Sequence, residues 1–291
     1  MRLALFDDYR LGVVAGERGE QIADVTGALP AHDADPVRAG WWRALCRDFA
    51  ELRPGLEAAA ATGPRLDLAA VRLLAPALNP SKVIACASNY RAHVDEMHEV
   101  QRRTLGHVED WMMNFDVFLK APSAIIGPRD DIVLPREVLD AGQEVHHESE
   151  LVLVIGAGGK DIAPDEAAGH VLGYTAGLDI TVRGPADRSR RKSYDTFAPL
   201  GPWITTADEA GDPGGLVIDL VRNGVDHRQH SRACDMITPV PAIVSYASRI
   251  MTLVPGDLIF TGAPPGVGPI HAGDVLETRI SGIGSMTIGV R

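Results

Sequence analysis

From residue 150 onwards, the chain is a succession of short apolar stretches separated by Gly, Pro and Asp turn signals. Runs of this length between turn residues are typical of strands, and a helical pattern interrupts them only at residues 240–253. Strands that follow one another without alternating helices predict a strand-dominated α+β domain and argue against a Rossmann fold. The stretches read ELVLVIG, HVLGYTAGLDITV, LGPWITT, LVIDLVRNG, DLIFTGAPPGVG, DVLETRI and SMTIGV.

The first part of the chain is organised differently. Residues 1–27 contain short strand-like stretches, whereas residues 41–61 carry apolar side chains at helical spacing. The proline-punctuated segment 74–82 then suggests a boundary. We expect a small N-terminal domain over residues 1–75 and a larger domain over residues 76–291.

The composition argues against several classes of function. Acidic residues outnumber basic ones by 39 to 28, and the net charge of −11 disfavours nucleic-acid binding, because phosphates require a basic surface. No apolar run approaches the ~20 residues that cross a bilayer, and the N-terminus meets charge too early for a secretory signal, so no membrane partner is expected. The cysteines, Cys46, Cys86 and Cys234, are widely spaced, which favours a reducing compartment and hence the cytoplasm.

Acidic residues directly precede a strongly apolar strand in the stretch VHHESELVLVIG, residues 145–156. Side chains two apart on a strand share a face, which puts the carboxylates of Glu148 and Glu150 roughly 7 Å apart. A hard divalent cation such as Mg²⁺ or Mn²⁺ would relieve their repulsion. The alternative is that the strand begins in water and both carboxylates are exposed.

Asp179 lies in an apolar setting within GYTAGLDITVRG, although Asp is depleted in strand interiors. It is either a ligand or a turn residue at the end of a strand. Arg183, four residues further on, is either an ordinary surface arginine or a fork for a substrate carboxylate.

A possible catalytic pair lies further upstream. Residues 83–90 are expected to form a buried strand and residues 91–105 a helix, on which His93 and Glu96 share a face at i and i+3. A carboxylate beside an imidazole fixes its tautomer and makes it a general base near neutral pH, but such pairs are also common on surfaces. The basic cluster RSRRKS, residues 188–193, is on charge alone a solvated loop.

Taken together, these segments resemble the fumarylacetoacetate hydrolase family from about Val83 to Ser285. The resemblance implies that family's fold, a mixed β-sandwich or β-roll catalytic domain with a small N-terminal α+β domain. The shared blocks are, in order, NYRAH with Glu96, FLKAPSAIIGP, HHESELVLVIG, GYTAGLDITVR, KSYDTFAPLGPWI, RNG, DMI, LVPGDLIFTGAPPGVGP and GIGSM.

The resemblance also implies roles for individual residues. Glu148, Glu150 and Asp179 match the family's carboxylate ligands for one Mg²⁺ or Mn²⁺ per subunit. His93 and Glu96 match the dyad that activates or positions water in the acylpyruvase and oxaloacetate decarboxylase branch, and Lys192 matches a substrate-binding catalytic lysine. The resemblance thereby implies that the basic loop at residues 188–193 is part of the site. For Lys120, the resemblance is compatible with either a structural role or a supporting role beside the site. The residues implied to contact substrate are Arg183, Tyr90, Thr261 and Gly262.

Three departures from the family pattern bear on the substrate. Ala87-Ser88-Asn89-Tyr90 replaces a glycine-led sequence, which is expected to tighten the turn before the dyad. Gly184 stands where an Asp usually follows the arginine. The segment 97–117 is longer than in compact members and is expected to form a lid. Because its length differs, the resemblance does not specify the size of the substrate. The short segment from Arg183 to Lys192 resembles a bacterial subgroup of aromatic or sugar-acid catabolism.

The resemblance therefore implies a homodimeric, metal-dependent hydrolase that cleaves a C–C bond in a 2,4-dioxo acid of the acylpyruvate type. The products would be pyruvate or a related 2-oxo acid and a carboxylic acid. Two alternatives stay open: a lyase or isomerase of the same family, such as an oxaloacetate-type decarboxylase or a 2-oxo-dienoate hydratase, and a non-catalytic protein that binds its ligand through a metal.

Overall fold

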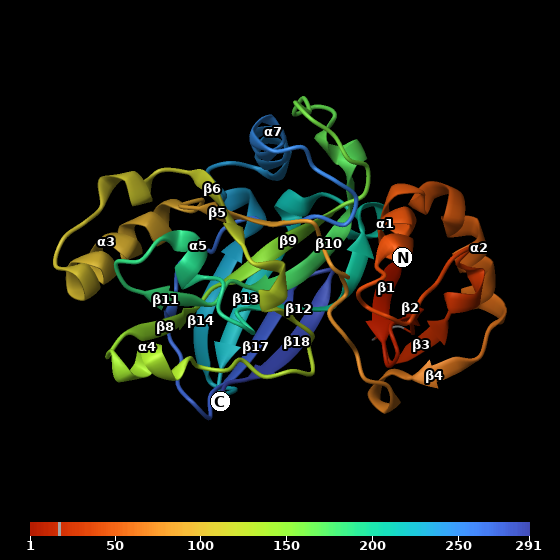
Figure 1. Cartoon of the computed structure of the whole chain (residues 1–291), viewed down its shortest axis with the longest axis horizontal. Coiled ribbons are helices and arrows are strands. Elements are labelled where there is room, and N and C mark those ends of the chain that lie inside the picture. Colours follow the sequence, from red (N-terminus) through yellow and green to blue (C-terminus); the bar gives the residue numbers. More distant parts are fainter. Residues whose placement is uncertain (17–18) are drawn as a thin grey trace.

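A computed structural model describes residues 1–16 and 19–291 and contains two main β-sheets with helices at their margins (Figure 1). The larger sheet has the strand order β4-β3-β2-β1-β12-β10-β9-β15-β5-β6, with β7 paired beside β12. Its strands are β1 (Arg2–Phe6), β2 (Arg10–Ala15), β3 (Gln21–Asp24), β4 (Arg65–Asp67), β5 (Val83–Ala87), β6 (Asp116–Lys120), β7 (Ile125–Ile126), β9 (Ser149–Ile155), β10 (Val171–Leu178), β12 (Ala198–Thr206) and β15 (Leu258–Phe260).

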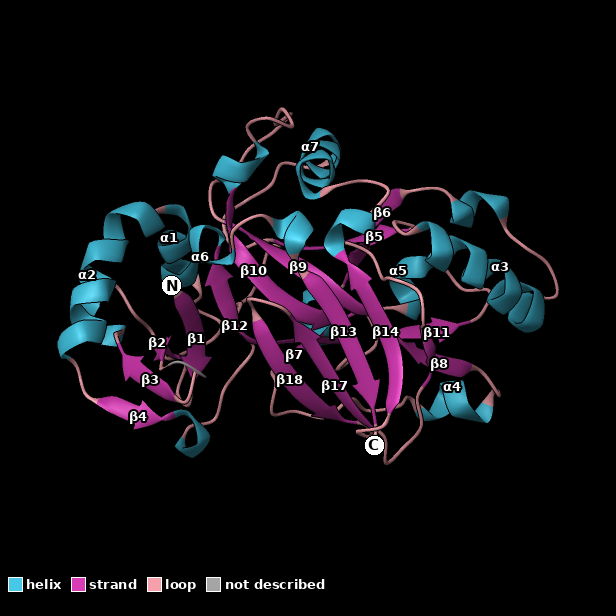
Figure 2. Ribbon diagram, turned by 180° about the vertical axis from the view of Figure 1, so that it is seen from behind, coloured by secondary structure: helices cyan, strands magenta, loops and turns pink. Residues whose placement is uncertain are grey.

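A second sheet, β14-β13-β17-β18, packs against the larger one (Figure 2). Apolar side chains of both sheets, such as Leu153 of the larger and Ile218 of the second, share one buried cluster. The prediction of a strand-dominated α+β fold of the sandwich type is thereby confirmed. The strands of the second sheet are β13 (Val217–Arg222), β14 (Asp226–Arg232), β17 (Val275–Ile280) and β18 (Gly284–Gly289).

The sequence analysis did not predict strand β14. Its sequence, DHRQHSR, is polar throughout, and only Gln229 on it is buried. The strand lies at the edge of its sheet and pairs with β13, so backbone hydrogen bonds rather than apolar burial define it.

A short third sheet, β11-β8-β16, continues the β9–β10 hairpin past a bend. It consists of β8 (Glu144–His147), β11 (Thr181–Arg183) and β16 (Gly268–Pro269). Strands β9 and β10 pair in the large sheet, β8 and β11 pair in the small one, and the two chain segments are interrupted at Glu148 and at Asp179. The Asp179 amide donates to the Glu148 carbonyl across the bend at 2.8 Å. The expectation that Glu148 and Glu150 lie on one continuous strand is corrected, because Glu148 occupies the break between two strands.

The helices lie at the two ends of the sandwich and over its edges (Figures 1 and 2). The pattern at residues 41–61 forms two helices rather than one, because the chain turns at Asp48. The helix expected at residues 91–105 is α3 and matches those bounds. The helices are α1 (Gly40–Arg47), α2 (Phe49–Thr62), α3 (Arg91–Leu105), α4 (Arg136–Asp140), α5 (Arg188–Arg191), α6 (Ala207–Ala210) and α7 (Val240–Ile250).

The N-terminal strands extend the large sheet through an antiparallel pairing of β1 with β12, in which Leu3 faces Ile204. Helices α1 and α2 cover this part of the sheet, and Trp42 and Leu56 are fully buried there. The N-terminal segment and the α3–α5 region occupy opposite ends of the molecule (Figure 1). A domain boundary near residue 75 stays a prediction. Among the described residues, no helix combines the length and the apolar character needed to cross a bilayer.

Candidate metal and substrate site

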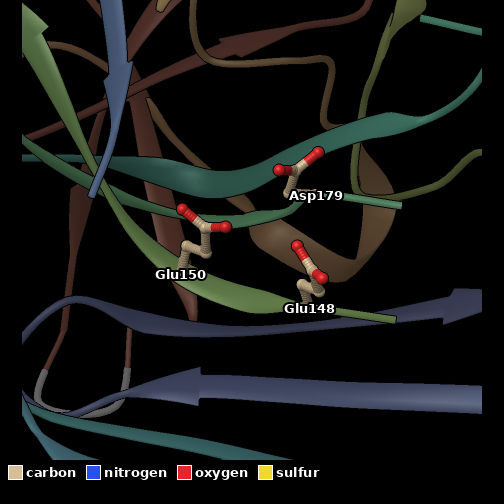
Figure 3. Close-up of side chains that lie close together, drawn as sticks. All are labelled: Glu148, Glu150 and Asp179. Atoms are coloured by element: carbon tan, nitrogen blue, oxygen red, sulfur yellow. The ribbon is translucent and has the colours of Figure 1, made fainter. Parts of the chain in front are cut away.

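Three buried carboxylates converge where the β9–β10 hairpin bends (Figure 3). Glu148, Glu150 and Asp179 each offer an oxygen, and these oxygens all lie within 4.8 Å of one another. The three residues are between 1% and 3% exposed, so water does not screen the repulsion between them. The possibility that the strand begins in water is thereby removed.

Cationic side chains surround this carboxylate cluster. Lys192 Nζ donates to Glu148 Oε2 and to Asp179 Oδ2, both at 2.6 Å. Arg183 Nη2 donates to Glu148 Oε1 at 2.5 Å. Lys120 Nζ donates to Asp179 Oδ1 at 2.5 Å and to the carbonyl of Lys192 at 2.6 Å. Lys120 therefore orients one carboxylate directly, a role that the sequence analysis left open.

The carboxylates differ in their electrostatic surroundings. Burial would raise the pKa of Glu148, but Lys192 and Arg183 outweigh it and hold that pKa well below its usual range. Burial, and then the charges of Asp179 and Glu148, raise the pKa of Glu150 well above its usual range. Glu150 Oε2 accepts a hydrogen bond from the Gly262 amide, whereas Oε1 has no hydrogen-bond partner within the described chain.

These observations fit a divalent cation. A buried carboxylate oxygen without a partner is costly, and it lies within reach of two further carboxylates. Mg²⁺ and Mn²⁺ prefer oxygen ligands of this type. The donor set is therefore suited to such an ion, with Glu148, Glu150 and Asp179 as its ligands.

The His93–Glu96 pair lies on α3 and faces the same region. His93 Nδ1 lies 3.3 Å from Glu96 Oε2, and the Glu96 carboxylate also accepts from the Gly266 amide at 3.2 Å. This second bond ties the pair to the loop after β15. His93 is buried and lines a pocket that Glu148 also lines. The pair is therefore not an ordinary surface contact.

The pocket lies between the carboxylate cluster and the α3 region. Its inner wall includes His93, Glu148, Arg183 and Lys192. Its outer wall comes largely from the segment 97–117, which consists of the end of α3 and a 3₁₀ turn at Asp110–Met113. The outer-wall residues are Met97, Val100, Gln101, Thr104, Leu105, Met112 and Met113. The segment thus lies where the expected lid would act, and movement of this segment stays a prediction.

The departures from the family pattern have structural consequences. Ala87 is the last residue of β5, and the left-handed conformation falls on Ser88, with φ of 56°. Ser88 Oγ donates to the Met112 carbonyl at 2.7 Å, which joins the turn to the outer wall of the pocket. Gly184 lines the pocket, and a Cβ atom there would lie 2.3 Å from Gln143 Nε2. The absence of a side chain at position 184 therefore leaves room for Gln143.

Three of the expected substrate contacts, Tyr90, Thr261 and Gly262, are not among the described residues that line the pocket. Thr261 is fully buried, and its hydroxyl donates to the Leu151 carbonyl at 2.9 Å. Gly262 has φ of 95°, and a Cβ there would lie 2.8 Å from Asn89 Cβ, so that only glycine presents its amide to Glu150 without strain. The hydroxyl of Tyr90 is buried and has no partner within the described chain. Substrate contact by Tyr90, Thr261 and Gly262 stays a prediction.

The sequence analysis placed the basic loop at residues 188–193 in the site through the resemblance, but it gave an individual role to Lys192 alone. Arg188 and Arg191 of this loop also line the pocket. The available signal was the density of basic residues beside that lysine, which is unusual in a chain of net charge −11.

Comparisons with known proteins agree with this geometry. A maleylpyruvate hydrolase of Aquipseudomonas alcaligenes is 36% identical over 293 residues, which cover 100% of this chain and 99% of that protein. A crystal structure of maleylpyruvate hydrolase from Sphingobium sp. SYK-6, in complex with manganese(II) and pyruvate, has a TM-score of 0.85 and 41% identity over 100% of this chain and 98% of that chain. A mitochondrial oxaloacetate tautomerase of Xenopus laevis is 36% identical over 231 residues, which cover 75% of this chain and 67% of that protein.

The family model for the fumarylacetoacetate (FAA) hydrolase C-terminal region matches residues 82–291. This match spans most of the chain and includes the three carboxylates, the His93–Glu96 pair and the cations around them. The chain belongs to the fumarylacetoacetate hydrolase family.

Proposed function

We propose that this protein is a metal-dependent hydrolase that cleaves the C–C bond of a 2,4-dioxo acid of the acylpyruvate type. The observation that carries the proposal is that His93, held by Glu96, lines the same pocket as Glu148 of the carboxylate cluster. A base beside a cation site suits the attack of water on a carbonyl group. A curated relative and a solved structure that each align with 100% of this chain are maleylpyruvate hydrolases.

The proposed cofactor is one Mg²⁺ or Mn²⁺ per subunit, held by Glu148, Glu150 and Asp179. When bound, such an ion would supply a positive charge that polarises the 2-oxo acid end of the substrate. The solved relative contains manganese and pyruvate, and pyruvate is the 2-oxo acid that the proposed reaction would release.

In the proposed reaction, His93 transfers protons, and Lys192 and Arg183 stabilise the negative charge that develops. His93 Nδ1 faces Glu96, so its Nε2 is the ring nitrogen that takes a proton from water as the water oxygen bonds to C4. The C3–C4 bond breaks, the new carboxylic acid leaves, and the electron pair forms the enolate of pyruvate. The proton that His93 took from the water is then transferred to C3 of the enolate, which gives pyruvate and returns His93 to its neutral form.

Lys192 and Arg183 are the proposed donors that stabilise this enolate. Lys192 uses two of its three N–H groups on Glu148 and Asp179, and the third remains for an oxygen in the pocket. Arg183 donates to Glu148 through Nη2, while its buried Nε has no partner in the described part of the chain. Donors that are already oriented stabilise developing negative charge without further reorganisation.

The second candidate is a lyase or isomerase of 2-oxo acids, such as an oxaloacetate-type decarboxylase or a dienoate hydratase. One relative is an oxaloacetate tautomerase, and the identity of 36% to it supports this candidate. Loss of CO₂ or movement of a proton requires no attacking water, so a decarboxylase or isomerase leaves the His93–Glu96 pair with a positioning role only, whereas a hydratase would still use the pair to activate water.

The oligomeric state and the cellular location of the enzyme are proposed as well. We propose a homodimer in the cytoplasm, in line with the family resemblance and with free thiols at Cys46, Cys86 and Cys234. Light scattering coupled to gel filtration measures the mass in solution, and a single species near the 31.1 kDa of one chain would contradict the dimer.

A paired assay tests the proposed activity. The purified protein is given acetylpyruvate, fumarylpyruvate or oxaloacetate, each with Mn²⁺ and each with a chelator, and pyruvate is measured. We expect metal-dependent pyruvate from an acylpyruvate in excess of the oxaloacetate rate, with solvent ¹⁸O in the released carboxylic acid. Turnover of oxaloacetate alone would reject the hydrolase and favour the second candidate.

A further inference from the structure

The pocket carries more positive charge than the carboxylate cluster uses. Arg183, Arg188, Arg191 and Lys192 line it, and Glu148 is the one acidic residue among the described residues of its wall. Arg183 and Lys192 both bond to Glu148. Within the described residues, by contrast, neither Arg188 nor Arg191 forms an ion pair or hydrogen bond with a carboxylate.

Arg188 is held in place by neutral groups. Its Nη2 donates to the Met112 carbonyl at 2.7 Å, and its guanidinium lies 5.0 Å from the centre of the Trp111 ring. The Met112 carbonyl is itself held by Ser88 Oγ at 2.7 Å. A guanidinium has five N–H donors, so most of those on Arg188 remain for a ligand. Its orientation is therefore set before any anion arrives.

Arg191 provides a second positive charge in the pocket wall and is more deeply buried than Arg188. It is only 8% exposed, and its guanidinium bonds to the carbonyls of Ala186 at 2.8 Å and of Val182 at 3.3 Å. A buried cation that bonds to carbonyl groups and to no carboxylate is costly, and an anion in the pocket would offset that cost. Burial and the nearby Arg183 lower the pKa of Arg191 to about 10, at which it remains a cation at neutral pH.

The spacing along the chain suits a short dicarboxylate. Arg188 begins α5 and Lys192 directly follows it. Four residues of helix correspond to about 6 Å, which is comparable to the length of a short acyl chain. A substrate with its 2-oxo acid end at Lys192 would thus bring a group at its other end to the region of Arg188.

We propose that Arg188 binds a second carboxylate at the distal end of the substrate, supported by the charge of Arg191, and that the substrate is therefore a dicarboxylic 2,4-dioxo acid. This inference rests on the proposed acylpyruvate hydrolase. Planar guanidinium groups bind carboxylates through two parallel hydrogen bonds, which gives both affinity and selectivity. Arg188 is then the residue that distinguishes a dicarboxylic from a monocarboxylic substrate.

The test compares Arg188→Gln with Arg190→Gln as its matched control. Arg190 lies on the same helix, is exposed and is outside the pocket wall. Fumarylpyruvate and acetylpyruvate serve as the dicarboxylic and monocarboxylic substrates. We expect Arg188→Gln to lower kcat/KM for fumarylpyruvate about 10- to 100-fold, as for a lost hydrogen bond to a charged group, and to leave acetylpyruvate within about twofold. Arg190→Gln is expected to leave both substrates within about twofold.

Two kinetic results would overturn the inference: unchanged kinetics on fumarylpyruvate, or equal losses on both substrates. A second readout does not depend on turnover. Calorimetry compares the binding of fumarate and crotonate. Arg188→Gln is expected to lower the affinity for fumarate about 10- to 100-fold and to leave the affinity for crotonate unchanged. If the unmodified enzyme hydrolyses neither acylpyruvate, the proposed function fails, but calorimetry still tests the Arg188 site. Weaker binding of fumarate but not of crotonate in Arg188→Gln supports the site. Equal fumarate affinity in Arg188→Gln and in the unmodified protein rejects it. Arg188→Lys, which keeps the charge, serves as a folding control.

Discussion

Replacing Glu150 with Gln tests the carboxylate cluster, because the change removes one charge and almost no volume. Glu150 Oε2 accepts from the Gly262 amide, and the amide oxygen of Gln can take over that bond. The new NH₂ group then occupies the position of Oε1, which has no partner in the described chain. There it can donate to a neighbouring carboxylate, whereas it would repel a cation. The variant is therefore expected to fold and to lose metal affinity.

The size of the effect follows from the ligand count. Glu150 is one of three carboxylates in the cluster, and even residues that only support metal ligands contribute 10- to 100-fold in affinity. We expect Mn²⁺ affinity to fall by at least about 100-fold, which corresponds to about 2.7 kcal/mol of metal-linked stability at saturation. At ~2.1 cal/mol/K per residue, a chain of 291 residues would lose on the order of 4 °C of the metal-induced increase in Tm.

Calorimetric titration with Mn²⁺ and thermal unfolding with and without a chelator measure both quantities. In the chelator, Glu150→Gln is expected to be at least as stable as the unmodified protein, because a buried like-charge repulsion is removed. Glu277→Gln, on an exposed position of β17, is the matched control and is expected to change neither value. Unchanged Mn²⁺ affinity in Glu150→Gln would refute the assignment, and so would a large loss of stability in the chelator.

Three further perturbations test other parts of the site and fold. His93→Ala is expected to lower acylpyruvate turnover by about 10²- to 10⁴-fold with Mn²⁺ affinity retained, and full turnover would remove its role as base. Lys120→Met leaves buried carboxylate charge uncompensated, so we expect a loss of about 3–5 kcal/mol in chemical denaturation; an unchanged midpoint would argue against this. Hydrogen bonds from Thr206 and Arg53 lower the pKa of Asp208 to about 2, so its contribution is present above its unfolded value of 3.8 and is lost as the pH falls towards 2. Asp208→Asn is expected to reduce the change in the free energy of unfolding over this pH range by less than about 1 kcal/mol, since the side chain is largely exposed.

Elements defined by local patterns were predicted well. The helix expected at residues 91–105 has those bounds in α3, and the strand expected at residues 83–90 forms as β5 but ends at Ala87. In both cases the spacing of apolar side chains is a short-range property that the sequence displays directly. The fold class followed from the same information, because turn residues separate most of the strands.

Elements that depend on their neighbours were missed. Strand β14 has no apolar alternation, and its pairing with β13 makes it a strand. The break at Glu148 was missed as well, because it arises where the β9–β10 hairpin leaves one sheet and enters another. Neither the pairing nor the bend is visible in the local pattern.

The sequence by itself determined the chemistry that is available: closely spaced acids before an apolar strand, a His–Glu pair on one helical face, and a basic cluster in an acidic chain. The tertiary structure decided which of these groups meet. Lys120 reaches Asp179 across 59 residues, Gly262 reaches Glu150 across 112, and Arg188 reaches the Met112 carbonyl across 76. The physical reason is that local propensities specify single strands and helices, whereas strand pairing and packing bring distant charges into one buried site, where burial makes each contact strong.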